Sequence, residues 1–102
     1  MIARVWRGAT LAENAEAYAA YLEETGMRGA RELPGARGSL VLRRIRAGYA
    51  EFETILLFDS MDDVRGFAGD DLDAAVFFEE DDRYLVERDL ECKHYEVDAR
   101  MI

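Results

Sequence analysis

The sequence predicts an α+β fold in which helices cover one face of an antiparallel sheet. Two observations carry this prediction. Residues 39–60 alternate between apolar and polar side chains on both sides of a two-residue turn, and apolar residues at helical spacing flank this stretch. The chain of 102 residues is 50% hydrophobic, which predicts one domain, residues 1–102, with a single modest core.

The N-terminal part predicts a strand followed by a helix. Residues 2–8 (IARVWRG) predict the strand, and the helix is expected to start at Thr10, because Thr10 and Glu13 have the spacing of a capping box. Gly26 or Gly29 is expected to end the helix. The apolar residues at spacings of four, three and four form one helix face: Leu11, Ala15, Tyr18 and Leu22.

The middle of the chain predicts a β-hairpin with Ala47-Gly48 as its loop. This loop pairs Arg46 with Tyr49, Arg44 with Glu51 and Leu42 with Glu53. One face of the hairpin then carries Val41, Arg43, Ile45, Phe52, Thr54, Leu56 and Phe58, and the other carries the apolar residues Leu40, Leu42, Ile55 and Leu57. Because both faces are partly apolar, we expect the helices to cover one face and a second body to cover the other.

The C-terminal part predicts a helix and a final strand. Ser60 is expected to cap a helix that ends at Gly69, and Asp71 is expected to cap a further short helix. The final strand is expected at about residues 87–97. The order strand, helix, strand, strand, helix, strand is the split βαβ arrangement of ferredoxin-like folds.

Charge and composition exclude some functions. A net charge of −9 argues against binding to nucleic acid and to anionic membrane surfaces, both of which require clustered basic residues. The single cysteine, Cys92, has no partner for an intramolecular disulfide, and no segment approaches the roughly 20 apolar residues of a membrane span. These features predict a cytoplasmic protein that does not insert into membranes.

Five segments together carry a resemblance to a known family: IARVWRG, GARGSLVLRR, FDSMDDVRGFAGDD, FFEEDDRYLVE and HYEV. They resemble small proteins of the antibiotic biosynthesis monooxygenase family, in the dimeric α/β-barrel superfamily, and the likeness runs over nearly the whole chain. The resemblance implies a homodimer whose two sheets pack face to face. It also implies a ligand cavity in each subunit between the sheet and the helices.

The segment 69–85 contains seven carboxylates around apolar residues. We expect these carboxylates to face solvent and cap helices, because the spacing of a calcium-binding loop is absent and blocks of charge are usually solvated. No metal site is predicted. The resemblance implies that Val76, Phe77 and Tyr84 line the cavity, so that this segment covers a ligand.

His94, the only histidine, is the candidate general base, although a structural role stays open. Arg7 is the candidate cation. The candidate substrate-binding residues are aromatic: Trp6, Phe58, Phe77 and Tyr84. Because side chains alternate along a strand, Trp6 and Arg7 are expected on opposite faces, and at most one of them lines the cavity.

These residues and the resemblance together favour a cofactor-independent monooxygenase that acts on a small aromatic, quinol-like or anthrone-like substrate. No haem, flavin or transition metal is expected, because residues 61–85 contain no histidine and the chain has no dinucleotide-binding glycine motif. Two alternatives stay open. One is a non-catalytic protein that binds a small ligand, and the other is a structural dimer whose own side chains fill the cavity.

Overall fold

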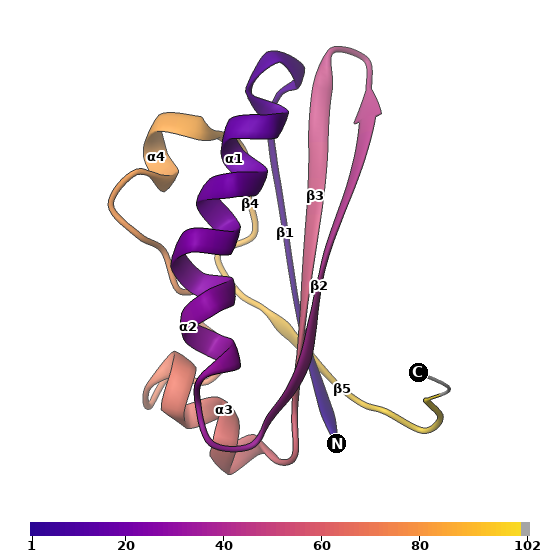
Figure 1. The fold of residues 1–102 in the computed structure, drawn as a ribbon, viewed down its shortest axis with the longest axis vertical. Coiled ribbons are helices and arrows are strands. Elements are labelled where there is room, and N and C mark those ends of the chain that lie inside the picture. Colours follow the sequence, from indigo (N-terminus) through magenta and orange to yellow (C-terminus); the bar gives the residue numbers. More distant parts are fainter. Residues whose placement is uncertain (101–102) are drawn as a thin grey trace.

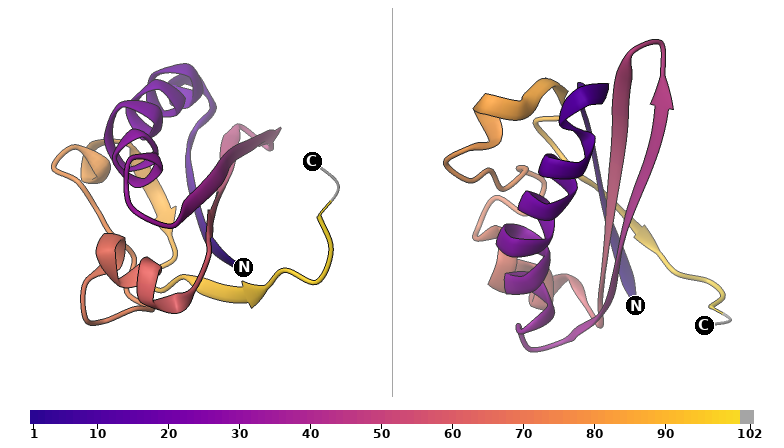
Figure 2. Two further views of the ribbon diagram at one scale, coloured as in Figure 1. Left: turned by 60° about the horizontal axis from the view of Figure 1, so that its bottom comes forward. Right: turned by 45° about the horizontal axis from the view of Figure 1, so that its top comes forward.

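Five strands form one antiparallel sheet in the computed structural model, which describes residues 1–100 (Figure 1). They are β1 (Ile2–Leu11), β2 (Ala36–Arg46), β3 (Tyr49–Phe58), β4 (Leu85–Arg88) and β5 (Lys93–Glu96). The strand order is β2-β3-β1-β4, and β5 also pairs with β1. The helices lie on one side of this sheet (Figure 2). The predicted ferredoxin-like α+β arrangement is therefore confirmed.

The hairpin between β2 and β3 has the predicted register. Arg46 faces Tyr49, Arg44 faces Glu51 and Leu42 faces Glu53. The two loop residues, Ala47 and Gly48, have positive φ angles of 51° and 83°. Tight two-residue hairpin loops require this left-handed backbone, which glycine adopts at little cost.

The first helical segment differs from its prediction at both ends. Strand β1 continues to Leu11, and the helical residues follow as η1 (Ala12–Asn14), α1 (Ala15–Leu22), η2 (Glu23–Met27) and α2 (Arg28–Arg31). Thr10 caps no helix. It is buried in β1 opposite Ala50, and its hydroxyl donates to the carbonyl of Leu11. Pairing with β3 satisfies the backbone hydrogen-bonding groups here and outweighs the capping pattern. Gly26 and Gly29 do not end the helix either, because it widens into the π-helical turn η2 and continues.

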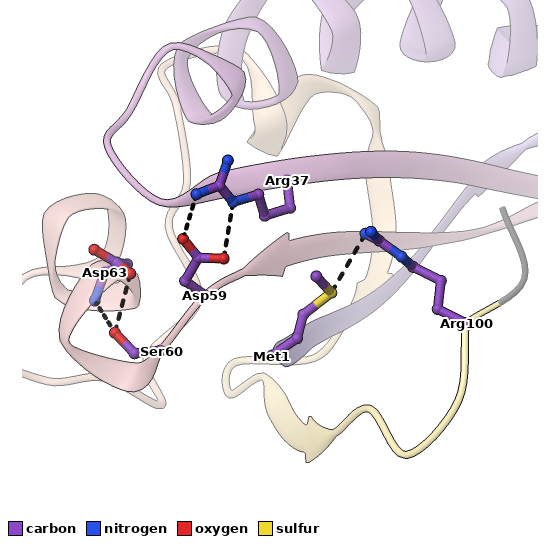
Figure 3. A network of polar contacts seen from close by, with 6 residues as sticks. All are labelled: Met1, Arg37, Asp59, Ser60, Asp63 and Arg100. Carbon is purple, nitrogen blue, oxygen red and sulfur yellow. Dashed lines mark hydrogen bonds and ion pairs between the residues drawn. The ribbon is translucent and has the colours of Figure 1, made fainter.

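The predicted ends of α3 (Met61–Ala68) are confirmed, whereas the further short helix predicted to start at Asp71 is not. The hydroxyl of Ser60 accepts a hydrogen bond from the backbone N–H of Asp63 at 3.3 Å, and Gly69 ends the helix with φ 81°. Figure 3 shows this cap beside the paired hydrogen bonds of 2.8 and 2.6 Å from Arg37 to Asp59. Asp71 begins only a turn. The next helix, α4 (Asp81–Tyr84), lies ten residues later.

The predicted final strand at 87–97 is divided into β4 and β5. Strand β4 pairs with residues 8–10 of β1, and β5 pairs with residues 2–5. Between them the chain turns to the segment that follows α3. The backbone N–H of Cys92 donates to the carbonyl of Asp73, and that of Ala75 donates to the carbonyl of Leu90. These hydrogen bonds fasten residues 73–75 to the edge of the sheet.

Two clusters of buried side chains fill the space between the sheet and the helices. One contains Trp6, Tyr18, Phe52 and Cys92, together with the small residues Ala15 and Ala50. The other contains Met27, Ala30, Leu56, Phe58 and Val64. Since the strand residues of both clusters alternate onto the sheet face that the helices cover, the opposite face contributes little to the core.

The acidic segment 69–85 is solvated at six of its seven carboxylates, and Asp81 is the exception. Asp81 is 4% exposed. Its Oδ1 accepts from the Tyr18 hydroxyl at 2.9 Å, and its Oδ2 accepts from the backbone N–H of Phe78 at 2.7 Å. The expectation that these acids face water is therefore wrong for Asp81, because a neutral donor from each side compensates the cost of burying its charge.

Replacing Asp81 by Ala should lower the free energy of unfolding by about 1–3 kcal/mol, because the buried Tyr18 hydroxyl and the Phe78 amide lose their acceptor. Urea denaturation at constant pH measures this difference. Glu79→Ala, at an exposed acid two residues away, should change it by less than about 0.5 kcal/mol. Equal changes in the free energy of unfolding would show that the hydrogen bonds of Asp81 do not stabilise the segment.

Candidate functional site

A cavity of about 50 Å³ lies between the sheet and the helices, where the two core clusters meet. Its walls are mostly apolar and aromatic, and its polar side chains include Arg4, Thr54 and Asp81. At roughly 10–15 Å³ for each water-sized group, the cavity has room for about three to five such groups. This is well below the roughly 300–1,000 Å³ of sites for drug-sized ligands.

Arg4 is buried at one end of this cavity. It lies on β1 two residues before Trp6, so strand alternation places both side chains on the helix-covered face. Only 3% of Arg4 is exposed. Its Nη1 donates to the carbonyl of Leu72 at 2.6 Å, its Nη2 donates to the carbonyl of Ala74 at 2.7 Å, and its Nη1 lies 3.0 Å from Nε2 of His94. Within residues 1–100, no ion pair includes Arg4.

The hydrogen bonds of His94 determine its tautomer. A guanidinium group has only donors, so Nε2 of His94 must accept from Arg4 and carry no proton. Nδ1 then carries the proton and donates to Oδ1 of Asp73 at 3.1 Å. Burial and the neighbouring charge of Arg4 lower the pKa of His94 below its usual value, and Asp73 opposes this shift. His94 is therefore neutral at pH 7.

Tyr18 and Asp81 line the other end of the cavity. Burial and the adjacent carboxylate raise the pKa of Tyr18 far above its usual range, so its hydroxyl stays a donor to Asp81. The Tyr18 ring packs edge-on against Phe52, which lies opposite Gly8 on β1, four residues beyond Arg4. At about 3.3 Å per residue, Gly8 and Arg4 lie about 13 Å apart along β1. The cationic and anionic groups thus lie toward opposite ends.

Aromatic residues after α3 cover the cavity. The Phe77 ring lies edge-on to Trp6 at 6.2 Å between centroids, and the guanidinium of Arg88 lies 4.7 Å above the same ring. Phe78 is 39% exposed and packs against Gly26, where an added Cβ would lie 3.2 Å from the Phe78 ring. Glycine in η2 therefore allows Phe78 to approach the helix closely, so Phe78 forms part of the cavity wall and also reaches the surface.

Two features are absent from residues 1–100. This part of the chain contains no cluster of three or more His, Cys, Asp or Glu side chains placed to hold a metal ion. None of its helices is long and apolar enough to cross a membrane.

No family model and no curated protein matches the sequence. Among solved structures, the chain is similar to a crystal structure described as a putative antibiotic biosynthesis monooxygenase from Bacillus cereus. The TM-score is 0.68 at 12% identity, over 99% of this chain and 94% of the other. The chain has the antibiotic biosynthesis monooxygenase fold. At this identity the similarity establishes the fold and leaves the reaction to the residues of the site.

Within this antibiotic biosynthesis monooxygenase fold, the predicted site residues separate into four groups, the last of which is Arg7 alone. Trp6 and Phe77 line the cavity. Phe58 and Tyr84 belong to or pack against the core clusters and do not line it. His94 reaches the cavity only through its contact with Arg4.

Arg7 lies on the exposed face of the sheet, away from the cavity. The expectation that Arg7 is the cation beside His94 is therefore corrected to Arg4. The reason is strand alternation, because Arg4 and Trp6 are two residues apart and share a face, whereas Arg7 follows Trp6 directly. The same alternation would have identified Arg4 from the sequence. Nothing in the sequence distinguishes the buried Asp81 from its acidic neighbours.

The pKa of His94 should be below 6.5, and Asp73→Asn should lower it further, because Asp73 stabilises the protonated imidazole. NMR titration of the imidazole protons measures this value without ambiguity, since His94 is the only histidine. The unfolded chain takes up the proton first, so stability should fall as the pH drops from 6.5 to the pKa of the folded protein. An increase in pKa in Asp73→Asn would contradict the assigned hydrogen bond.

Proposed function

We propose that this protein is a cofactor-independent monooxygenase that acts on a small aromatic, quinol-like or anthrone-like substrate. One observation carries the proposal: Arg4 is buried beside an aromatic cavity without a carboxylate partner in residues 1–100. Such a cation stabilises the oxyanion that forms when a phenol or an enol loses its proton. The fold shared with the Bacillus cereus protein supports the same reaction class.

The substrate supplies the electrons in this reaction. For an anthrone-like methylene, dioxygen converts the CH₂ group to a carbonyl, and the second oxygen atom leaves as water. Loss of a proton creates the electron-rich carbanion, whose charge resides mainly on the oxygen beside Arg4. Asp81 is the carboxylate that lines the cavity, and we assign it the role of the base. His94 is a positioning residue, because it acts through Arg4.

A second function is favoured by the size of the cavity. A volume of about 50 Å³ is too small for a fused-ring anthrone unless the aromatic cover moves. Both oxygens of Asp81 also accept hydrogen bonds within the protein, from the Tyr18 hydroxyl and the Phe78 amide, which makes this carboxylate a weaker base toward a substrate. A non-catalytic protein that binds a small ligand in the same cavity is therefore the alternative.

The proposal includes a C2 homodimer closed through the uncovered sheet face. Apolar residues continue across neighbouring strands on this face, because Leu40 pairs with Ile55 and Ile55 pairs with Val5. Leu40 and Leu42 are 47% and 45% exposed. Monomeric proteins rarely leave a continuous apolar sheet face in water, and a two-fold interface would cover both copies at once.

Oxygen uptake with a panel of hydroquinones and anthrones tests the reaction. Wild type should consume oxygen above the uncatalysed rate. Arg4→Gln should lower kcat/KM by about 10²-fold or more, because the oxyanion loses its cation. The loss in Arg4→Gln should greatly exceed that in Arg7→Gln, which removes a guanidinium from the opposite face of the same strand. Absence of uptake with every substrate would leave the ligand-binding alternative.

Light scattering at micromolar concentration should give about twice the chain mass of 11.6 kDa. Leu42→Lys should shift the protein to the monomer, because a charge on the apolar face has to be desolvated in the interface. Glu24→Lys, at an exposed position in the helical segment, should leave the mass unchanged. A monomeric wild type would exclude the dimeric barrel.

A further inference from the structure

We propose that the cavity binds a small organic anion, namely a monocarboxylate on an apolar or aromatic body, with its carboxylate on Arg4. This inference rests on the proposed function for the location of the ligand site, and it specifies the class of substrate. An aromatic acid meets the requirements of the reaction and of the site. It brings the ring that the reaction needs and the negative charge that Arg4 has no partner for.

The donors of Arg4 supply the first argument. A guanidinium group has five N–H bonds, and those of Arg4 have three acceptors: Leu72, Ala74 and His94. Nη1 uses both of its hydrogens and Nη2 uses one. Within residues 1–100, the Nε–H and the second hydrogen of Nη2 therefore have no acceptor. Donors on these two neighbouring nitrogens can bind both oxygens of one carboxylate.

The unused Nε–H of Arg4 touches open space rather than packed protein. Among residues 1–100, no fully buried side-chain nitrogen or oxygen lacks a hydrogen-bond partner. Nε of Arg4 has no partner, so it cannot be fully enclosed by protein atoms. Because only 3% of Arg4 is exposed and its side chain lines the cavity, the cavity is the space that Nε faces.

The charge around Arg4 supplies the second argument. Its three hydrogen-bond partners are two backbone carbonyls and a neutral imidazole. Burial raises the pKa of the neighbouring Cys92, so this group is a neutral thiol and not a thiolate. Asp73 contacts the far side of His94 and makes no contact with Arg4. A buried charge without a direct counter-charge favours an anionic ligand, which would supply one.

The other end of the cavity determines the shape of the ligand. Asp81 repels a second negative charge, so the ligand carries one carboxylate and directs its apolar body away from Arg4. Space for about three to five water-sized groups fits a short aliphatic acid as the cavity stands. An aromatic ring requires the half-exposed Phe78 to move from Gly26.

Titration of the fluorescence of Trp6, the only tryptophan and a wall of the cavity, tests the inference. Benzoate should bind wild type at least about 10-fold more tightly than benzamide or benzyl alcohol, which have the same ring without the charge. Arg4→Gln should abolish this preference. Arg28→Gln, at an exposed arginine of α2, should retain it and controls for net charge.

Equal affinity for benzoate and benzamide, or no response to benzoate at about 10 mM, would overturn the inference on wild type alone, even if Arg4→Gln fails to fold. The failure of the proposed function is separate. Benzoate preference without oxygen uptake supports the anion site and refutes the monooxygenase. Oxygen uptake without any preference for carboxylates supports the monooxygenase and refutes the anion site.

Discussion

The burial of Arg4 is the constraint on which most of this structure depends. Its guanidinium binds the carbonyls of Leu72 and Ala74 and contacts His94, so one side chain of β1 joins the segment after α3 to β5. An arginine is costly to bury unless its donors are used and its charge is balanced. Here three donors are used within the protein and the charge is not balanced by any direct contact. The same side chain therefore closes the fold and leaves a site for an anion.

The aromatic side chains around Arg4 explain why the site is small and mostly apolar. Trp6 is held by a hydrogen bond of 2.8 Å from its indole nitrogen to the carbonyl of Asp89, and its ring supports Phe77. Gly8 has to be glycine for this arrangement, because an added Cβ would lie 2.4 Å from the Trp6 ring. In such a low-dielectric space the attraction between Arg4 and an oxyanion is stronger than in water. This favours both anion binding and chemistry through an oxyanion.

Local signals predicted the parts of the fold that local interactions determine. The register of the hairpin follows from its two-residue loop, and the ends of α3 follow from Ser60 and Gly69. The errors fall where partners distant in sequence decide the structure. Thr10 continues a strand because β3 pairs with it, and the last strand divides because residues 90–92 bind residues 73–75. Neither partner is visible in the sequence around the residue concerned.

The candidate site shows the same division. Alternation along β1 separates Trp6 from Arg7 and would have placed Arg4 beside Trp6, whereas the burial of Asp81 depends on Tyr18, 63 residues away. The most direct test of the carboxylate site is the ¹⁵N NMR signal of Nε–H in Arg4, followed while benzoate is added to wild type. This signal should shift in proportion to the amount of ligand bound, because Nε donates to the carboxylate. An Arg4 signal that stays constant while the ligand binds elsewhere would contradict it.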